Sequence, residues 1–368
     1  MHIVHCLTHS THGGGQAVPY LLVKNLLRYH SEIRHTVLLP SNGIFIERFR
    51  DIGIQVVEFP FDVLNPLNFF RIKTIVQNLN PDIIHSHGRG AGLYLRSISK
   101  SRLKSKRVHT HHGFHLPEKI LPRLMFRLSE DFFLQNTDRV ISVSDSEADV
   151  IRKTNPRSRE IIKIIPNIVD RESVQDNAKR ESGEDDSIAK KLDGKFVVTM
   201  IGRDDPVKNY ALAFSAMKEV LESDRSMLFL LIGIGERTAQ QADVFHRYPE
   251  NVIILPASPN PLPLLSKSSV LLVTSKREAG APLVMMEAAC LGIPVVSVRV
   301  RGLFDAIQHE RNGLCVENNS HSVAQALLRC AKEKTLMDRM SKGAMEYAMS
   351  FDTQSWCDQY YSMYTELL

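Results

Sequence analysis

The feature of this sequence that most constrains its fold is the alternation of short apolar runs with longer helical patterns. Runs of about four to eight residues rich in Val, Ile and Leu are typical of strands buried on both faces of a sheet. Helical patterns lie between them, so the first half predicts a doubly wound parallel sheet of α/β class. Its strand candidates are HIVHCL (2–7), HTVLLP (35–40), IQVVEF (54–59), DIIHS (82–86), RVHTH (107–111) and RVISVS (139–144). Ser144 and Glu147 have capping-box spacing, which predicts a helix directly after the last of these runs.

The alternation restarts after a polar stretch, 170–194, whose composition favours a linker or a flexible excursion between two domains. The second set predicts another doubly wound sheet, and two such sheets predict a cleft lined by the carboxyl ends of their strands. The aromatic tail 350–368 has a helical pattern and is predicted to return to the first domain. We therefore expect domains at 1–167 plus 350–368, and at 168–349. The second set of strands is KFVVTMIG (195–202), SMLFLLIG (226–233), NVIILP (251–256), SVLLVTS (269–275), PVVSV (294–298) and GLCVE (313–317).

Bulk properties fit this division, because 368 residues exceed one ordinary hydrophobic core. Five scattered cysteines without paired spacing favour a reducing compartment over a disulfide or zinc framework. The N-terminal MHIVHCLTH has no signal pattern and no apolar run is long enough to span a bilayer, so we expect a cytoplasmic protein. The net charge is +5, and the segment RSISKSRLKSKR (96–107) carries six basic residues and no acid. That cluster favours an anionic partner, such as a membrane surface, a phosphorylated lipid or a nucleic acid.

Two first-half loops follow strand ends with unusual residues. THGGGQA (11–17) leads into a helix, where glycines allow close backbone approach and the helix N-terminus favours anions. It does not match the dinucleotide fingerprint, and a plain tight turn is an equal alternative. HTHHGFH (109–115) holds four histidines, but no Cys or Asp motif accompanies them, which disfavours a metal site. A histidine at such a strand end is better suited to hydrogen-bond a phosphate or a sugar hydroxyl.

Three second-half loops complete the set of candidate sites. In IGRDDPVKN (201–209), Arg203 and Lys208 lie across a turn and predict a phosphate clamp, with surface salt bridges as the alternative. In LLIGIGE (230–236), Gly233 and Gly235 allow a nucleotide near the backbone. In SKREAGAPLVMMEAACLGIPVV (275–296), Glu278 lies in a loop at a strand's carboxyl end and Glu287 lies in the following helix. Two solvated charges are the plain alternative for these glutamates.

Taken together and in this order, the glycine loop, THHG, GRDDPVK, LIGIGE and the two glutamates resemble glycosyltransferase family 4. The resemblance extends over nearly the whole chain. It implies a GT-B fold of two facing Rossmann-like domains, the first for the acceptor and the second for a nucleotide-sugar donor. It also implies a retaining, metal-independent transfer without any further cofactor, with a UDP-sugar as the preferred donor and a GDP-sugar as the alternative.

The resemblance also assigns roles to residues. Arg203 and Lys208 match the basic pair on the donor diphosphate, and His112 matches the histidine beside the reaction centre. Glu287 matches the glutamate on the ribose and Glu278 the glutamate on the transferred sugar. The remaining donor contacts are assigned to loop glycines and one alanine: Gly14, Gly15, Gly233, Gly280 and Ala281.

One departure from the family pattern concerns the spacing of the two glutamates. Eight residues separate Glu278 from Glu287, one more than in the family, so counting back from Glu287 places the first acid at Ala279. We expect Ala279 to be accommodated as a bulge, with Gly280 at positive φ and Pro282 fixing the start of the helix. The alternative is that Glu278 does not take the role of the family's first glutamate.

The acceptor is expected to be a glycan on a lipid, such as lipopolysaccharide or an undecaprenyl-linked sugar. KILPRLMFRLSEDFF (119–133) has an apolar stripe and a basic face, which predicts either a core-packed helix or an interfacial one on an anionic membrane. The stripe is Ile120, Leu121, Leu124, Met125 and Leu128, and the basic residues are Lys119, Arg123 and Arg127.

Two other functions remain open from the sequence. A nucleotide-sugar 2-epimerase of the same fold would need carboxylates in first-domain loops, and THGGGQA and HSHGRGAG supply none. A basic nucleic-acid-binding protein would explain residues 96–107 but not the clamp or the glutamates, so no nucleic acid partner is expected.

Overall fold

The computed structural model describes residues 1–11, 13–180, 186–235, 238 and 242–368. The chain divides into two compact units, 1–168 with 352–368 and 169–351. The sequence placed these divisions at 167/168 and 349/350. Each unit has its own parallel sheet, and the two are described separately below.

The first unit is built on a seven-stranded parallel sheet of order β3-β2-β1-β4-β5-β6-β7. Six of its strands were predicted from the sequence, whereas the three-residue edge strand β7 was missed because its run IKI is too short to stand out. β4 at the centre is buried along its whole length, including the polar His85, Ser86 and His87 at its carboxyl end. The strands are β1 His2–Leu7, β2 Arg34–Leu39, β3 Gln55–Glu58, β4 Ile83–His87, β5 Lys106–Thr110, β6 Arg139–Ser142 and β7 Ile162–Ile164.

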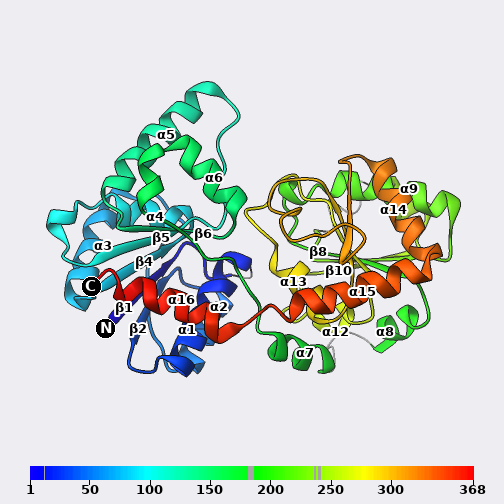
Figure 1. The fold of residues 1–368 in the computed structure, drawn as a ribbon, viewed down its shortest axis with the longest axis horizontal. Helices are drawn as coiled ribbons and strands as arrows, with labels where there is room; N and C mark the ends of the chain where they lie inside the picture. Colours follow the sequence, from blue (N-terminus) through cyan, green and yellow to red (C-terminus); the bar gives the residue numbers. More distant parts are fainter. Residues whose placement is uncertain (12, 181–185, 236–237, 239–241) are drawn as a thin grey trace. The chain divides into compact units, whose positions relative to one another are not determined.

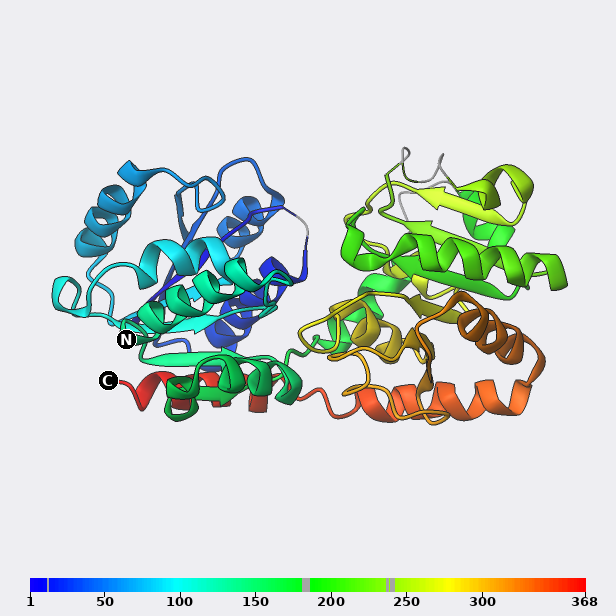
Figure 2. The ribbon, with the colours of Figure 1, turned by 90° about the horizontal axis from the view of Figure 1, so that it is seen from above.

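Helices cover both faces of this sheet (Figure 1). One face carries α1 (Gly14–Tyr29), α2 (Ile44–Asp51) and α16 (Thr353–Thr365), and the other carries α3 (Pro66–Leu79), α4 (Gly88–Arg96), α5 (Ile120–Gln135) and α6 (Asp145–Thr154). The C-terminal α16 packs on α1, and its Trp356 Nε1 donates a hydrogen bond of 2.8 Å to the Pro166 carbonyl. Both termini therefore lie on the first unit, close to each other in two views (Figure 2).

The second unit contains a six-stranded parallel sheet of order β10-β9-β8-β11-β12-β13, the doubly wound order predicted by the restart of the alternation. Helices α9 (Tyr210–Ser223) and α14 (Ser320–Lys332) pack together on one face. The other face carries α12 (Leu262–Leu265), α13 (Leu283–Cys290) and α15 (Lys334–Ala348). The short α11 (Asp243–Arg247) packs on α9. The strands are β8 Val197–Ile201, β9 Leu228–Ile232, β10 Val252–Leu255, β11 Val270–Val273, β12 Val295–Val298 and β13 Gly313–Val316.

The polar stretch 170–194 is not a plain linker, which corrects the sequence prediction. Around residues 181–185, which lie outside the described part, it contains α7 (Arg171–Lys179) and α8 (Asp186–Leu192). Asp170 caps α7 by accepting a hydrogen bond of 3.1 Å from the Ser173 N–H, and Val174 is buried in the core of the second unit. A favourable N-cap and one apolar anchor order a segment whose composition alone suggests disorder.

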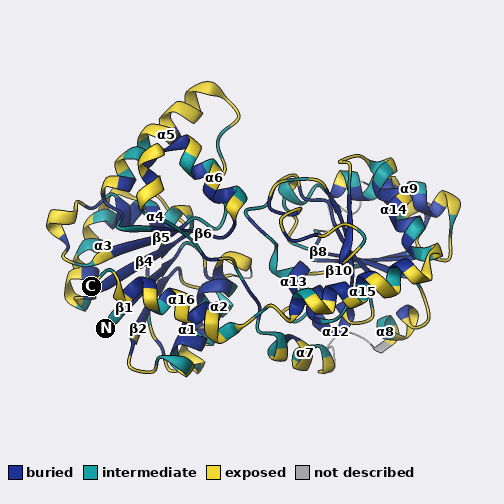
Figure 3. Ribbon diagram, in the orientation of Figure 1, coloured by how far each residue is buried: buried dark blue, intermediate teal, exposed yellow. Residues whose placement is uncertain are grey.

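The apolar stripe of α5 faces outward, so the core-packed alternative is wrong for these side chains. The helix packs through another side, on which Phe126, Glu130 and Leu134 are buried. Figure 3 shows α5 as one of the largely exposed helices of the first unit. The exposed fractions are 86% for Ile120, 67% for Leu121, 51% for Leu124, 64% for Met125 and 60% for Leu128. Among the described residues no helix has both the length and the hydropathy needed to cross a bilayer.

The basic cluster at 96–107 is only partly a surface feature, which also corrects the sequence analysis. Arg96 is buried and forms an ion pair with Glu130, with 2.8 Å between Nη2 and Oε2. Arg107 is buried too, and its guanidinium donates to the carbonyls of Ile98 and Ser99. Two of the six charges therefore stabilise the fold, because a buried guanidinium is tolerated only when paired or hydrogen-bonded. The exposed remainder is Lys100, Arg102, Lys104 and Lys106.

Candidate active site

The loop after β8 carries the predicted basic pair in a compact turn. Asp205 Oδ1 accepts a hydrogen bond of 2.8 Å from the Val207 N–H and so caps the 3-10 turn Pro206–Lys208. The Tyr210 hydroxyl donates to the Gly202 carbonyl at 2.8 Å. Arg203 is exposed, and its guanidinium has no hydrogen-bond partner among the described residues. The turn thus fixes the backbone around a guanidinium that is available to bind an anion.

Lys208 is paired with Glu278 from the loop after the neighbouring strand β11. Nζ of Lys208 lies 2.7 Å from Oε1 of Glu278, and the two side chains are 25% and 18% exposed. Two further bonds tie the loops together: Thr274 Oγ1 donates to the Lys208 carbonyl and the Lys276 N–H donates to the Val207 carbonyl, both at 2.8 Å. The carboxyl ends of adjacent parallel strands bring together two residues that the sequence proposed separately.

The loop of Glu278, Ala279, Gly280 and Ala281 lies against Gly302. A Cβ atom on Gly302, whose φ is +83°, would lie 2.5 Å from the Glu278 carbonyl oxygen and 3.0 Å from the Gly280 nitrogen. Gly280 is not one of the glycines with positive φ, so the prediction that it supplies a left-handed turn is wrong. The extra residue is accommodated without that turn, and the left-handed glycine at this place is Gly302, which the sequence analysis did not single out.

Glu287 lies on α13, which begins at Leu283 with Pro282 as its N-cap residue. Its side chain is partly buried and has no hydrogen-bond or ion-pair partner among the described residues, and this burial raises the pKa of its carboxyl to about 7. A partly buried carboxyl without a partner loses hydration of its charged form, so the proton is held to higher pH. Such a group can both donate and accept hydrogen bonds near neutral pH.

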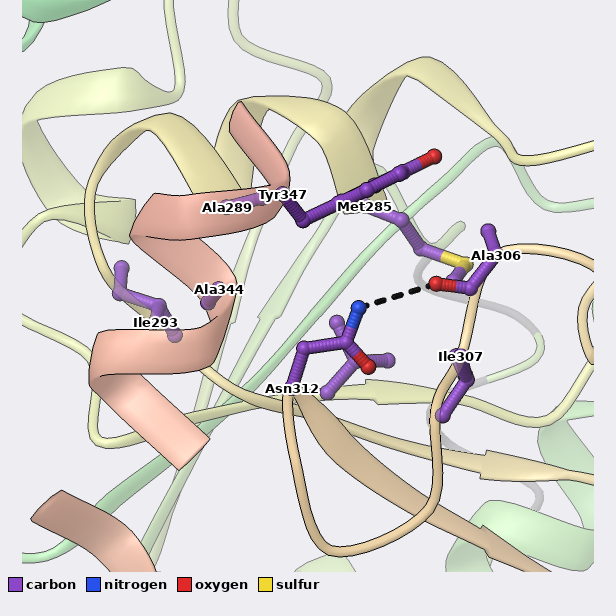
Figure 4. Close-up of a pocket in the computed structure, with 9 residues that line it drawn as sticks. Met285, Ala289, Ile293, Ala306, Ile307, Asn312, Ala344 and Tyr347 are labelled. Atoms are coloured by element: carbon purple, nitrogen blue, oxygen red, sulfur yellow. Dashed lines mark hydrogen bonds between the residues drawn. The ribbon is translucent and has the colours of Figure 1, made fainter. Parts of the chain in front are cut away.

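The side of α13 roughly opposite Glu287 packs into the unit. Residues two apart on a helix point about 200° from each other, so Met285 and Ala289 face away from Glu287. They line a small apolar pocket with Ala344 of α15 and the loop before β13, where the Asn312 amide donates to the Ala306 carbonyl at 3.0 Å (Figure 4). The pocket holds about 10 Å³, room for a single water, so it is too small for a nucleotide.

Gly233, after β9, is explained by the packing of two loops. Its φ is +91°, and a Cβ there would lie 2.5 Å from the Gly202 carbonyl oxygen. Gly235 likewise lies against Asp204, with 2.5 Å between a built Cβ and Oδ2. These glycines let the loop after β9 contact the loop of Arg203, which is a structural reason for glycine at both positions.

In the first unit, Gly14 and Gly15 form the first turn of α1, after Gly13 as the N-cap residue. His12, which precedes them, lies outside the described residues. The N–H groups of a first helical turn have no carbonyl partner within the helix and favour anions. Nothing lies within 4 Å of a Cβ built on Gly15, so this turn has free space beside it.

His112 follows β5 in a constrained loop. Its φ is +53°, unusual for a residue with a side chain, and its Nε2 lies 3.2 Å from Nδ1 of His87. The N–H groups of Gly113 and Phe114 both donate to Oε1 of Glu147 at 2.9 Å. The sequence assigned Glu147 to the start of α6, where Ser144 indeed caps the helix, but missed that its carboxylate also holds the His112 loop.

Burial lowers the pKa of His112 to about 4, so its imidazole is neutral at physiological pH. A neutral imidazole offers one N–H donor and one lone pair. Which nitrogen carries the proton depends on the hydrogen bond that the other nitrogen makes.

Two family models match the chain: "Glycosyltransferase Family 4" over residues 12–173 and "Glycosyl transferases group 1" over residues 182–347. An Escherichia coli UDP-Gal:alpha-D-GlcNAc-diphosphoundecaprenol alpha-1,3-galactosyltransferase is 26% identical, with 69% of this chain and 67% of that protein covered. The Saccharomyces cerevisiae phosphatidylinositol N-acetylglucosaminyltransferase GPI3 subunit is 25% identical over 74% of this chain, which spans 62% of that protein's length.

Among solved structures, Anabaena Alr3699/HepE in complex with UDP-glucose superposes with a TM-score of 0.84 at 19% identity, with both chains covered completely. At this identity the similarity establishes the fold, two Rossmann-like sheets in the GT-B arrangement of elements.

Proposed function

The chain belongs to the family 4 glycosyltransferases, and from this premise we propose that it transfers a sugar from a nucleotide-sugar donor, with retention of anomeric configuration, to a hydroxyl of a lipid-linked glycan. The observation that carries this proposal is the ion pair of Lys208 and Glu278, together with Arg203 on the same loop as Lys208, whose guanidinium has no partner in the described part of the chain. Two cations and a carboxylate at the carboxyl ends of β8 and β11 fit a diphosphate attached to a hydroxyl-rich sugar.

The charges of this cluster suit a leaving diphosphate. As the sugar–phosphate bond breaks, negative charge grows on the phosphate oxygens, and fixed cations stabilise it without reorganising. Arg203 can bind bidentately, and Lys208 can exchange part of its contact with Glu278 for a phosphate oxygen. The two basic side chains offset the charge themselves, so we propose a metal-independent reaction in which the phosphate accepts the proton of the attacking hydroxyl.

The other donor contacts follow from local geometry. Glu287, with a carboxyl pKa of about 7, is proposed to hydrogen-bond the ribose, because it can accept from one hydroxyl and donate to another. Gly280 and Ala281 offer backbone groups next to Glu278. A UDP-sugar is the preferred donor and a GDP-sugar the alternative, a choice supported by the UDP-sugar named for one relative and by UDP-glucose bound in the Anabaena protein.

The first unit is proposed to bind the acceptor, and His112 and the first turn of α1 are proposed to contact the donor's sugar and diphosphate. The relatives support a lipid-linked acceptor: one is named for a sugar on diphosphoundecaprenol and another for phosphatidylinositol. A lipid carrier stays in a bilayer, so the enzyme must reach the membrane surface.

The exposed stripe of α5 fits that requirement. Five apolar side chains, each at least half exposed, lie on α5 together with Arg123 and Arg127, and Lys119 is the N-cap residue of this helix. Such a helix can bury its apolar side in the headgroup region while its cations face anionic lipids. We propose peripheral contact with the cytoplasmic face of an anionic membrane.

The proposal is tested by incubating the full chain with a panel of nucleotide sugars and a lipid-linked glycan acceptor, with and without EDTA. We expect nucleoside diphosphate release that depends on the acceptor and persists in EDTA, and a product whose anomeric proton coupling matches that of the donor. An inverted anomer would contradict retention. An epimerised donor without transfer would contradict the glycosyltransferase assignment for this substrate set.

A further inference from the structure

Three buried histidines in the first unit, His5, His35 and His87, form a hydrogen-bonded row that ends at the half-buried His112. Nδ1 of His35 lies 3.3 Å from Nε2 of His5, and Nδ1 of His5 lies 3.3 Å from Nε2 of His87. Nδ1 of His87 lies 3.2 Å from Nε2 of His112. The row thus runs from β2 through β1 and β4 to the loop after β5, and each contact joins Nδ1 of one ring to Nε2 of the next.

All four rings are neutral in this environment. Burial lowers the pKa of His35 and His112 to about 4 and holds the pKa of His5 and His87 well below the usual value. A neutral imidazole has one N–H and one lone pair, so each ring must donate through one nitrogen and accept through the other. Since the contacts are continuous, every ring in the row must have the same tautomer: all Nδ1–H or all Nε2–H.

The far end of the row decides between these two possibilities. Nε2 of His35 is buried and has no hydrogen-bond partner among the described residues. If the protons were on Nε2, that atom would be a buried N–H without an acceptor, which is rarer in proteins than an unpaired acceptor. Protons on Nδ1 leave only a lone pair unpaired there and make each ring donate toward His112.

We propose that this histidine row fixes His112 as the Nδ1–H tautomer, and that His87 is the positioning residue that acts on it. Nε2 of His112 is then occupied as an acceptor, and the remaining ring group is an N–H donor. In the proposed transfer reaction, His112 would donate a hydrogen bond to an oxygen of the nucleotide sugar and would not act as a base. Only the kinetic test below rests on the proposed function.

A metal site is the main competing use of these residues, because the ligand atoms of His5, His85 and His87 lie within 4.8 Å of one another. His85, however, already uses both ring nitrogens: Nδ1 is 2.6 Å from the Tyr364 hydroxyl and Nε2 is 2.8 Å from Thr110 Oγ1. Metal binding would break one of these bonds and also the His5–His87 contact. The row of hydrogen bonds accounts for the same geometry without such a loss.

The tautomer is measured directly by ¹⁵N NMR of the full chain with labelled histidine at neutral pH, and the His112 signals are assigned by their loss in His112→Gln. We expect a protonated Nδ1 and an unprotonated Nε2 in the parent protein. His87→Phe removes the donor to Nε2 and should shift His112 toward the other tautomer. His87→Asn, whose amide N–H can replace Nδ1–H, should restore the parent pattern. This readout needs no substrate, so it stands even if the transfer reaction is not found.

His85→Phe is the matched control, since it removes an equally buried histidine of the same strand that lies outside the row. It should leave the His112 tautomer unchanged. With a donor that supports turnover, His87→Phe should lower kcat about tenfold or more with little change in donor KM, and His87→Asn should recover most of the loss. A proton on Nε2 of His112 in the parent, an equal effect of His85→Phe, or stoichiometric zinc in the purified protein would overturn the proposal.

Discussion

Lys208 and Glu278, 70 positions apart in the sequence, form an ion pair with 2.7 Å between Nζ and Oε1. The pair links the loop of the predicted phosphate clamp to the loop of the predicted sugar contact. Both side chains keep some exposure, so the pair is accessible to a ligand and its contribution to folding stability is modest. The pair lies at the carboxyl ends of adjacent strands, where parallel sheets bind ligands, so changes to either residue should affect donor binding or turnover.

Arg203→Ala and Lys208→Ala should each weaken donor binding without unfolding the protein. One charge-assisted hydrogen bond contributes about 1.5–3 kcal/mol, so the Kd for nucleoside diphosphate should rise about tenfold or more. Calorimetric titration and Tm measure the two effects separately. Lys267→Ala removes a surface ion pair of similar length, 2.9 Å to Asp193, and serves as the control. If the double variant Arg203→Ala/Lys208→Ala binds nucleoside diphosphate as tightly as the parent, these two residues do not bind the diphosphate.

Glu278→Gln should lower kcat far more than it raises donor KM. The amide keeps the shape of the side chain, and its oxygen can still accept a hydrogen bond from Lys208. The substitution removes the negative charge of Glu278, which is proposed to contact the transferred sugar. Interactions that strengthen in the transition state affect kcat rather than ground-state binding. Glu219→Gln is the control, because Glu219 is also a hydrogen-bonded carboxylate: its Oε1 accepts from the Ser320 hydroxyl at 2.6 Å. If Glu278→Gln turns over like the parent, the sugar contact must come from backbone groups near Ala279 and Gly280.

Glu287→Gln should raise donor KM and also change how stability depends on pH. The pKa of about 7 in the folded state lies above the usual value of 4.5, so between these two pH values the folded protein holds a proton that the unfolded chain has released. The stabilising effect of this proton is complete below about pH 4.5 and is lost as pH rises through 7. Urea unfolding at pH 5 and pH 8 should therefore show a smaller decrease in the free energy of unfolding for the variant than for the parent. Equal decreases in the two proteins would contradict the raised pKa.

Much of this arrangement could be predicted because apolar runs and strand ends are local features of the sequence. Arg203, Lys208 and Glu278 could be proposed as site residues because each follows such a run. What could not be predicted depends on contacts between distant segments. The burial of Arg107 requires the carbonyls of Ile98 and Ser99 to converge on it, and a charge-rich sequence does not show that.

The helix α5 and the histidines show the same limit. An apolar stripe at helical spacing is the same in sequence whether it faces a core or solvent, and only tertiary packing placed Phe126 inward and Leu124 outward. His5, His35 and His87 come from three strands, so their row is invisible in any one of them.

The exposed stripe of α5 should mediate binding to anionic vesicles. Replacing Ile120 and Leu124 together by Ser removes two exposed apolar side chains and should reduce co-sedimentation with phosphatidylglycerol vesicles severalfold. Added salt should weaken the binding of the parent, because screening acts over about 8–10 Å. Met345→Ser, at a 45% exposed position on α15, is the control. Equal binding to neutral and anionic vesicles would contradict a role for the basic residues.

Gly302→Ala should damage activity more than stability explains. At φ +83° any side chain is strained, and here a Cβ would also lie 2.5 Å from the Glu278 carbonyl oxygen, so the loop must move. Gly194 separates the two effects: its φ is +71° and nothing lies within 4 Å of a built Cβ. Both substitutions should cost about 1–2 kcal/mol of unfolding free energy from backbone strain alone. Only Gly302→Ala should also lower kcat about tenfold or more, because a displacement of about 1 Å at a reacting group has effects of that size or greater.

If Gly302→Ala keeps the parent kcat, the loop of Glu278 tolerates displacement and its carboxylate does not contact the reacting sugar in the way proposed. If Gly194→Ala lowers kcat equally, the loss comes from strain in the second unit rather than from the position of Glu278.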